Sequence, residues 1–410
     1  MAPGSYNPDA MRHFTQLPPL ALYIHLPWCE QKCPYCDFNS HAVREDIPEN
    51  AYVDALLADL ALDLPQVWGR KIETVFIGGG TPSLFSVDAI NKLLSGLRAL
   101  TNLSPMAEIT MEANPGSAET EKFCGFREAG INRLSIGVQS FSDRCLSLLG
   151  RVHNSAQATH AVEAAQAAGF ARINIDLMFA LPEQTLSAAV ADVEHALALQ
   201  TTHLSYYQLT LEPNTLFHHV PPPLPEDDLA FDMQTAAQEK IQNAGFAQYE
   251  ISAYARQEDY CQHNLNYWQF GDYLGIGAGA HGKITHPADA SIRRYSKQRS
   301  PARFIATSNS DARIVGNRTV EIAETGIEFM MNAMRLIDGV PKQLFLEHTG
   351  ITPVQIQGAI EKAQSAGLLI VEKNRVRPSE RGLLFLNDLL DIFMNEPAAP
   401  ARVIPINAAP

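Results

Sequence analysis

The sequence predicts an α/β fold, in which a mostly parallel sheet is followed by a small, helix-rich, winged-helix-like C-terminal domain. Up to about residue 209, six short apolar segments alternate with longer amphipathic ones. Strands joined by helix-length connections form βα units, and such units build a parallel sheet. Near the other end, SAGLLIVEKNRVRPS (365–379) has the pattern of a two-stranded wing after a helix, and a further helix is expected at 383–394.

The individual elements follow from the apolar periodicity. Strands are expected at 21–26, 73–77, 108–112, 133–137, 172–178 and 203–209, and helices at 49–64, 87–100, 118–129, 142–149, 155–168 and 187–199. In EAGINRLSIG (128–137), AAGFARINID (167–176) and NAGFAQYEIS (243–252), a helical run ends in Ala-Gly before an apolar segment. Glycine just past a helix adopts the left-handed conformation at little steric cost. These junctions are therefore expected to be helix-to-strand corners.

The organisation along the chain predicts a tail at 1–19, a core domain at 20–285, a C-terminal domain at 286–395 and a flexible tail at 396–410. The boundary at 285 is placed where the alternation of strands and helices stops. Within the core, the proline-rich HHVPPPLPEDD (218–228) is expected to form a loop or hinge before a helix at about 226–243.

The composition limits the kinds of partner. The chain has 410 residues and a net charge of -14, from 45 acidic and 31 basic residues. This balance argues against nucleic acid or an anionic membrane as the main partner. The first 20 residues lack the apolar core of a signal peptide, and no run reaches the roughly 18 apolar residues of a transmembrane segment. The simplest expectation is a cytoplasmic protein.

Three of the six cysteines, Cys29, Cys33 and Cys36, crowd into HLPWCEQKCPYCDF (25–38). Their C-x3-C-x2-C spacing lets three thiolates converge from one loop. A structural zinc normally has four protein ligands, and only His25, Asp37 or His41 is nearby as a fourth. A [4Fe–4S] cluster on three cysteines leaves one iron open to an outside ligand, and this interpretation is favoured. Three free thiols are the remaining alternative.

Glycines and polar residues at strand ends suggest a ligand site. ETVFIGGGTPS (73–83) is a strand that runs into three glycines, whose backbone N–H groups can approach a ligand closely. The alternating glycines of YLGIGAGAHG (273–282) lack the following acidic residue of a dinucleotide site. Polar residues lie at or just beyond expected strand ends, where barrel enzymes bind ligands, although such residues can also be structural caps. They are Glu112, Gln139, Arg151 and Asp176.

These motifs together resemble the radical SAM superfamily, in which C-x3-C-x2-C follows the first strand. The resemblance implies a partial (β/α)6 barrel, a [4Fe–4S] cluster, S-adenosyl-L-methionine and an electron donor such as flavodoxin or ferredoxin. Within the superfamily, residues 20 to 390 are similar to oxygen-independent coproporphyrinogen III oxidases and the related HemW haem chaperones. The similar segments are YIHLPWCEQKCPYCDF, VFIGGGTPS, ITMEANP, RLSIGVQSF, INIDLMFALP and DYLGIGAGAHG.

The resemblance also implies roles for residues at matching positions. The cluster ligands would be Cys29, Cys33 and Cys36, and a first S-adenosylmethionine would contact Tyr23, Tyr35, Gly79, Glu112 and Arg151. The oxidases hold a second S-adenosylmethionine, for which the matching positions are Gly80, Thr81, Gln139, Asp176, Leu209 and His281. Leu209 and His281 match in position but not in residue type.

Three features favour the chaperone branch. Phe38 stands where the oxidases carry a further cysteine, and residues 1–19 precede the first expected strand, where the oxidases have a longer N-terminal extension. In CQHNLNYW (261–268), HNLNYW resembles a motif that HemW proteins use for haem. His263 could be an axial ligand, with Cys261 as the competing ligand, while Tyr267 and Trp268 could pack on the porphyrin. A structural loop with core aromatics is the alternative for this segment.

The expected function is therefore a haem chaperone that binds haem and transfers it to an acceptor protein. The alternative is an oxidase that decarboxylates the propionates of coproporphyrinogen III.

Overall fold

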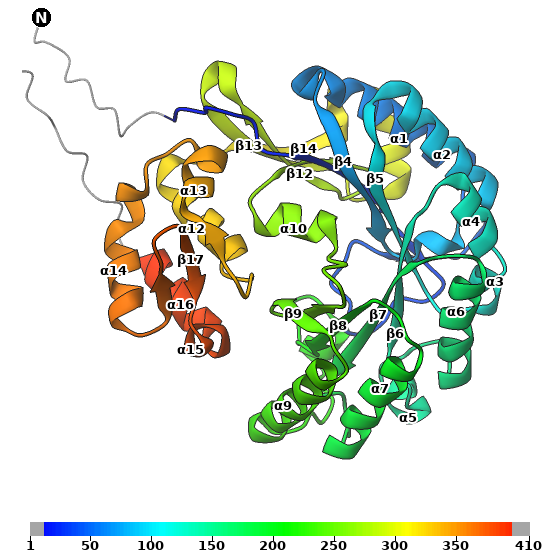
Figure 1. Cartoon of the computed structure of the whole chain (residues 1–410). Helices are drawn as coiled ribbons and strands as arrows, with labels where there is room; N and C mark the ends of the chain where they lie inside the picture. Colours follow the sequence, from blue (N-terminus) through cyan, green and yellow to red (C-terminus); the bar gives the residue numbers. More distant parts are fainter. Residues whose placement is uncertain (1–11, 396–410) are drawn as a thin grey trace, which may run out of the picture.

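The computed structural model describes residues 12–395 as a curved α/β sheet joined to a smaller helical unit (Figure 1). Within these residues the main sheet has twelve strands in the order β14-β13-β12-β11-β1-β4-β5-β6-β7-β8-β10-β9. Its central strands are β1 (Leu20–Leu26), β4 (Lys71–Gly79), β5 (Asn102–Ala113), β6 (Arg133–Gln139), β7 (Arg172–Phe179) and β8 (His203–Gln208). These six strands are parallel and lie at the six expected places. The predicted α/β class is thus confirmed.

The remaining strands lie at the edges or in small sheets. They are β2 (Trp28–Cys29), β3 (His41–Ala42), β9 (Ala247–Glu250), β10 (Ala253–Ala255), β11 (Asp272–Ile276), β12 (His281–His286), β13 (Ser291–Lys297), β14 (Ile314–Thr319), β15 (Val340–Pro341), β16 (Leu369–Val371) and β17 (Arg375–Pro378). At one edge β11 pairs with β1 in parallel, and β12, β13 and β14 continue antiparallel.

The helices between strands also follow the sequence pattern. They are α1 (Glu49–Asp63), α2 (Val87–Leu100), α3 (Ser117–Thr120), α4 (Phe123–Ala129), α5 (Asp143–Leu148), α6 (Ser155–Ala167), α7 (Leu186–Ala198), α8 (Leu216–His219), α9 (Asp227–Asn243), α10 (Gln262–Trp268) and α11 (Pro301–Thr307), with 3-10 turns at Leu64–Val67, Pro82–Leu84, Pro287–Asp289 and Asp311–Arg313. The helix expected at 118–129 is two pieces, α3 and α4. Gly130, Gly169 and Gly245 have φ of 114°, 85° and 84°, so the three Ala-Gly corners do use the left-handed conformation.

The strands alternate in polarity, and this alternation gives the sheet two different faces. In β6, Leu134, Ile136 and Val138 are fully buried in the main hydrophobic core. The helices α1, α2, α4, α6, α7 and α9 cover the outer face of the sheet (Figure 1). Arg133, Ser135 and Gln139 point to the inner, concave face. The inner face is therefore polar, and α10 lies on it.

The sheet extends past residue 285, where the sequence analysis ended the core domain. β12 spans that boundary, and β13 and β14 carry the sheet on to Thr319. These strands, SIRRYSK and IVGNRT, contain few apolar residues and several arginines, so no apolar run marks them in the sequence. In the structure the second unit begins at α12.

The second unit comprises α12 (Ile322–Ala333), α13 (Lys342–Thr349), α14 (Gln357–Ser365), α15 (Glu380–Leu384), α16 (Leu386–Asn395), a 3-10 turn at Pro353–Ile356 and a three-stranded sheet β15-β17-β16. The expected wing is β16 and β17, which pair antiparallel. The helix expected at 383–394 breaks at Phe385. The expected tail at 396–410 lies outside the described residues. Within residues 12–395, the helices are too short or too polar to cross a bilayer.

A buried charge network fastens α1 to the antiparallel edge. Lys297 Nζ lies 2.5 Å from Asp59 Oδ1 and 2.6 Å from Asp63 Oδ2. Arg313 completes the group, with its Nε 2.8 Å from Asp59 and its Nη2 2.6 Å from Asp63. All four side chains are almost completely buried. Each charge is matched by an opposite one, which is the condition under which buried ions are tolerated.

Replacing Lys297 by Met is expected to destabilise the protein by about 3–5 kcal/mol, because two buried carboxylates would then share one cation. Denaturant unfolding would measure the loss. The control is Lys71→Met, which removes an exposed pair with Glu73 and should cost less than about 1 kcal/mol. Equal, small losses for both variants would contradict a structural role for the network.

Candidate functional site

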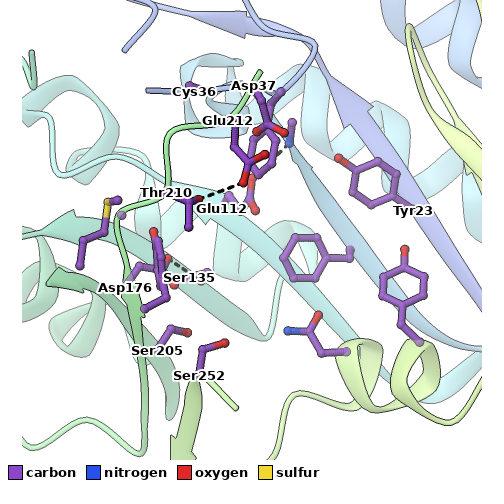
Figure 2. Close-up of a pocket in the computed structure, with 18 of the residues that line it drawn as sticks. Tyr23, Cys36, Asp37, Glu112, Ser135, Asp176, Ser205, Thr210, Glu212 and Ser252 are labelled. Atoms are coloured by element: carbon purple, nitrogen blue, oxygen red, sulfur yellow. Dashed lines mark hydrogen bonds between the residues drawn. The ribbon is translucent and has the colours of Figure 1, made fainter. Parts of the chain in front are cut away.

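The polar concave face borders a cavity of ≈1830 Å³. This volume is larger than the roughly 300–1,000 Å³ of a pocket for one small ligand. Strands β1 and β4 to β8, the cysteine loop, α10 and the second unit all contribute to its lining. Figure 2 shows Tyr23 on one side of the pocket and Asp176, Ser135 and Ser205 on the other. The cavity is therefore a large, polar space with walls from both units of the fold.

Cys29, Cys33 and Cys36 lie in the loop after β1 and line this cavity. None of them forms a disulfide. Burial raises the pKa of the Cys29 and Cys36 thiols, and the neighbouring cysteines raise it further. Arg151 Nη1 lies 3.5 Å from Cys33 Sγ, so one cation already faces the cysteines. A bound metal would overcome the raised pKa values, because a coordinated thiol loses its proton.

The thiols are not gathered around a single ion. In the described part of the chain, no three His, Cys, Asp or Glu side chains come close enough to hold one metal ion. Three accessible thiols on one loop, facing a cavity, do fit a polynuclear cluster, whose irons are ligated separately.

The glycine loop after β4 packs directly on the cysteine loop. Gly80 N–H donates to Leu26 O at 2.8 Å, and Thr81 N–H donates to Trp28 O at 2.7 Å. A Cβ on Gly80 would lie 2.4 Å from Trp28 O. Gly79 has φ of 119°, and a Cβ there would lie 2.6 Å from the His25 ring. The glycines are thus required by contacts within the protein itself, and the two loops form one unit.

Glu112 connects this loop to the strands beside it. Its Oε2 accepts a hydrogen bond from Gly79 N–H at 3.1 Å. Burial, and to a smaller extent the neighbouring Asp176, raise the pKa of Glu112 to about 7, although the Gly79 hydrogen bond opposes both. Asp176 is in turn bonded to Ser135 at 3.0 Å and to Asn174 at 2.8 Å. A cation bound at Glu112 would find a carboxylate that lacks a positive partner of its own.

Apart from the competing ligand Cys261, the structure brings together the residues that the sequence singled out for the cluster, S-adenosylmethionine and haem. Each of the cluster, S-adenosylmethionine and haem candidates lines the same cavity: Tyr23, Cys29, Cys33, Tyr35, Cys36, Gly79, Gly80, Thr81, Glu112, Gln139, Arg151, Asp176, Leu209, His263, Tyr267, Trp268 and His281. Their contacts with ligands stay predictions. Cys261 does not line the cavity. It is buried, its Sγ lies 3.7 Å from Glu108, and burial raises the pKa of its thiol to about 12.

The segment HNLNYW is the helix α10, not a loop, and its histidine is already engaged. His263 Nδ1 lies 3.0 Å from Thr74 Oγ1, and its Nε2 lies 3.0 Å from Tyr267 OH. The His263 side chain is buried, which lowers its pKa to about 3. Trp268 lies beneath the Arg335 guanidinium at 4.2 Å, and its buried Nε1 has no hydrogen-bond partner. α10 thus offers the cavity two aromatic rings and a neutral imidazole.

Two groups of cavity residues were missed at the sequence level. The first consists of the inner-face residues Arg133, Ser135, Asn174, His203 and Ser205. The sequence did contain a pattern that could have identified these residues, because polar residues alternate with apolar ones in RLSIGVQ, RINIDLMF and HLSYYQ. The second group comes from the second unit, where Leu384 and Phe385 line the cavity although they are 59% and 51% exposed. No local sequence pattern places them there.

Comparisons with known proteins agree with this geometry. The family profile of the Radical SAM superfamily matches residues 23–196, and that of the HemN C-terminal domain matches residues 324–385. Heme chaperone HemW of Escherichia coli strain K12 is 48% identical over 93% of this chain and 100% of that protein. Heme chaperone HemW of Haemophilus influenzae is 46% identical over 93% and 99%, and that of Bacillus subtilis 34% identical over 91% and 99%.

Among solved structures, coproporphyrinogen III oxidase (HemN) from Escherichia coli, a radical SAM enzyme, has a similar fold. The TM-score is 0.78 at 19% sequence identity, with 96% of this chain and 97% of that chain covered. At this identity the likeness concerns the fold alone.

The raised pKa of Glu112 can be measured directly. A ¹³C NMR titration should give a midpoint near pH 7, so that the carboxyl is neutral below this pH and charged above it. In Asp176→Asn the midpoint should fall, because a neighbouring negative charge that disfavours ionisation is removed. Asp143→Asn, which changes an exposed residue of α5, is the control. A Glu112 midpoint at the usual pKa of glutamate in the unaltered protein would contradict this account of the site. So would a midpoint that is the same in Asp176→Asn as in the unaltered protein.

Proposed function

The chain belongs to the family of HemW haem chaperones within the radical SAM superfamily, and we propose that it binds haem beside a [4Fe–4S] cluster and transfers it to an acceptor protein. One observation carries the proposal: the cysteine loop and the aromatic residues of α10 line one cavity. With ≈1830 Å³, it has room for S-adenosylmethionine and a porphyrin together.

The cluster end of the cavity uses the loops that pack together. Cys29, Cys33 and Cys36 would hold the cluster, which supplies electrons to the sulfonium of S-adenosylmethionine when both are bound. Arg151, whose Nη1 lies 3.5 Å from Cys33 Sγ, would balance the negative charge of Cys33 as a cluster ligand. Glu112, oriented by Gly79 N–H, offers its carboxylate to the amino group of S-adenosylmethionine. A flavodoxin or ferredoxin is the kind of electron donor that this chemistry needs.

The haem end is built on α10. The rings of Tyr267 and Trp268 provide apolar surface for the porphyrin. His263 is the proposed axial ligand, oriented through Nδ1 by Thr74 in the way that ligating histidines are commonly held. Its Nε2 must first leave Tyr267 OH. Breaking one neutral hydrogen bond costs about 0.5–1.5 kcal/mol, which a coordinate bond to iron can offset.

The oxidase alternative has less support from this cavity. Phe38, where the oxidases have a further cysteine, lines the cavity and is 57% exposed. It offers a ring to a ligand but no sulfur. The curated relatives named above, which match almost the full chain, are chaperones.

Anaerobic reconstitution with coproporphyrinogen III and haem offered in parallel tests the function. We expect stoichiometric haem uptake, no decarboxylated product and about four irons per chain. Cys33→Ala should abolish iron uptake and leave haem binding intact, because the two sites lie on different elements. Cys124→Ala, which removes an exposed cysteine, is the control. Decarboxylated product, or failure to bind haem, would overturn the proposal.

The role of His263 can be separated from that of its neighbours. His263→Ala should shift the Soret band and weaken haem retention. Tyr267→Phe frees Nε2 while keeping the ring, so haem affinity should rise about 2- to 10-fold, the equivalent of one hydrogen bond. His160→Ala, on the surface of α6, should change neither.

Four histidines line the cavity, and His281 is the competing ligand. His25 and His203, like His263, have both ring nitrogens hydrogen-bonded. A Soret band that shifts in His281→Ala and is unchanged in His263→Ala would assign the iron to His281 instead.

A further inference from the structure

Arg133 is a buried cation that faces the cavity. It is the first residue of β6, and its side chain is only 2% exposed. Ser135, Gly137 and Gln139, which alternate with it along the strand, line the cavity as Arg133 does. Because residues i, i+2 and i+4 of a strand share one face, the guanidinium lies on the inner side of the sheet.

In the described part of the chain, this guanidinium is not paired with any group. Its Nε is buried without a hydrogen-bond partner. Across residues 12–395, Arg133 forms no ion pair or side-chain hydrogen bond, although nearly every other cation on the cavity wall has a partner. Arg151 contacts Cys33, Lys283 is paired with Asp272, and Arg335 with Glu250.

The nearby carboxylates are already used. Glu108 forms an ion pair with Arg172 at 2.8 Å and accepts hydrogen bonds from the backbone N–H groups of Gln262 and His263, both at 3.1 Å. Asp176 accepts hydrogen bonds from Ser135 and Asn174, and burial raises its pKa. Both acids act on Arg133 at longer range, and neither neutralises it by contact.

A guanidinium cannot lose its proton in a protein, and a buried charge without a partner is costly. The geometry of guanidinium matches a carboxylate, with two parallel hydrogen bonds. An anionic group that enters the cavity would therefore gain a strong, directional partner at this point of the wall.

We propose that Arg133 anchors a carboxylate-binding subsite that takes a propionate of haem. This rests on the proposed haem binding. Arg133 lies beside the haem end, since Glu108 of the adjacent strand β5 holds the start of α10 through its bonds to Gln262 and His263. In this arrangement the porphyrin would lie on Tyr267 and Trp268. One propionate would reach Arg133 on the inner face of the sheet, next to Ser135 and Asn174.

The chemistry recognised is a ligand carboxylate, and S-adenosylmethionine also carries one. Two comparisons separate the sources. Haem and haem dimethyl ester differ only at the propionates, which methylation makes neutral, while S-adenosylmethionine and its decarboxylated analogue differ in the methionine carboxylate. We expect the reconstituted protein to bind haem about 10- to 100-fold more tightly than the dimethyl ester, the range of a charge-assisted contact.

Arg133→Gln should remove this preference by weakening haem binding and leaving dimethyl ester binding unchanged. Arg133→Lys keeps the positive charge but loses the planar pair of N–H donors, so it should retain part of the preference for haem over its ester. Arg299→Gln is the control, because Arg299 is an exposed arginine on the cavity wall. Thermal unfolding and iron content would show that each variant is folded and carries its cluster.

Equal affinity of the unaltered protein for haem and its ester would overturn the inference, and this readout needs no variant. Arg133→Gln could instead weaken the preference for S-adenosylmethionine over its decarboxylated analogue and leave the preference for haem over its ester unchanged. This result would overturn the propionate assignment. Absence of any haem binding would instead reject the proposed function. Unchanged haem affinity in folded Arg133→Gln, with normal binding otherwise, would reject only the role of Arg133.

Discussion

The strict alternation of side chains along the central strands is the constraint on which the rest of the structure depends. In a β-strand, successive residues point to opposite faces, so one sequence must satisfy both a helix-covered outer face and a concave inner face. β6 and β7 place leucine and isoleucine outward and Arg133, Ser135, Asn174 and Asp176 inward. An inner face of this polarity cannot be closed by an apolar core. It has to be satisfied by its own hydrogen bonds, by water or by ligands.

Most of the inner polar groups satisfy one another. Asn174 bridges Ser135, Asp176 and His203, and His203 continues the network to Tyr249 at 2.9 Å. Two charged groups stand apart from this self-sufficient network. Within residues 12–395, the Glu112 carboxylate accepts a hydrogen bond from Gly79 N–H, and the buried Nε of Arg133 has no hydrogen-bond partner. The charges that folding leaves unmatched are of opposite sign, which suits a cavity that receives both an ammonium and a carboxylate.

Much of the fold and site could be predicted because it rests on local patterns. Apolar periodicity located the six parallel strands, and the cysteine spacing and glycine loop located the residues now found around one cavity. The strands β13 and β14 could not be found this way, since they are polar edge strands held by pairing to β12. Pairing across the fold also decides that His263 is engaged by Thr74, a residue 189 positions away. Leu384 and Phe385 reach the cavity only because the second unit folds back onto it.

The likeness to coproporphyrinogen III oxidase shows why fold and function have to be argued separately. A TM-score of 0.78 over 96% of this chain means that the two chains share the same overall arrangement of strands and helices. The radical SAM cysteines and the glycine loop belong to that shared scaffold and cannot separate a chaperone from an oxidase. The proposal therefore rests on the cavity wall of this chain: a phenylalanine at position 38, and α10 with its aromatic rings near a buried arginine. The proposed contacts to the porphyrin ring and a propionate would hold a finished porphyrin, and Phe38 adds no further sulfur beside the three cysteines.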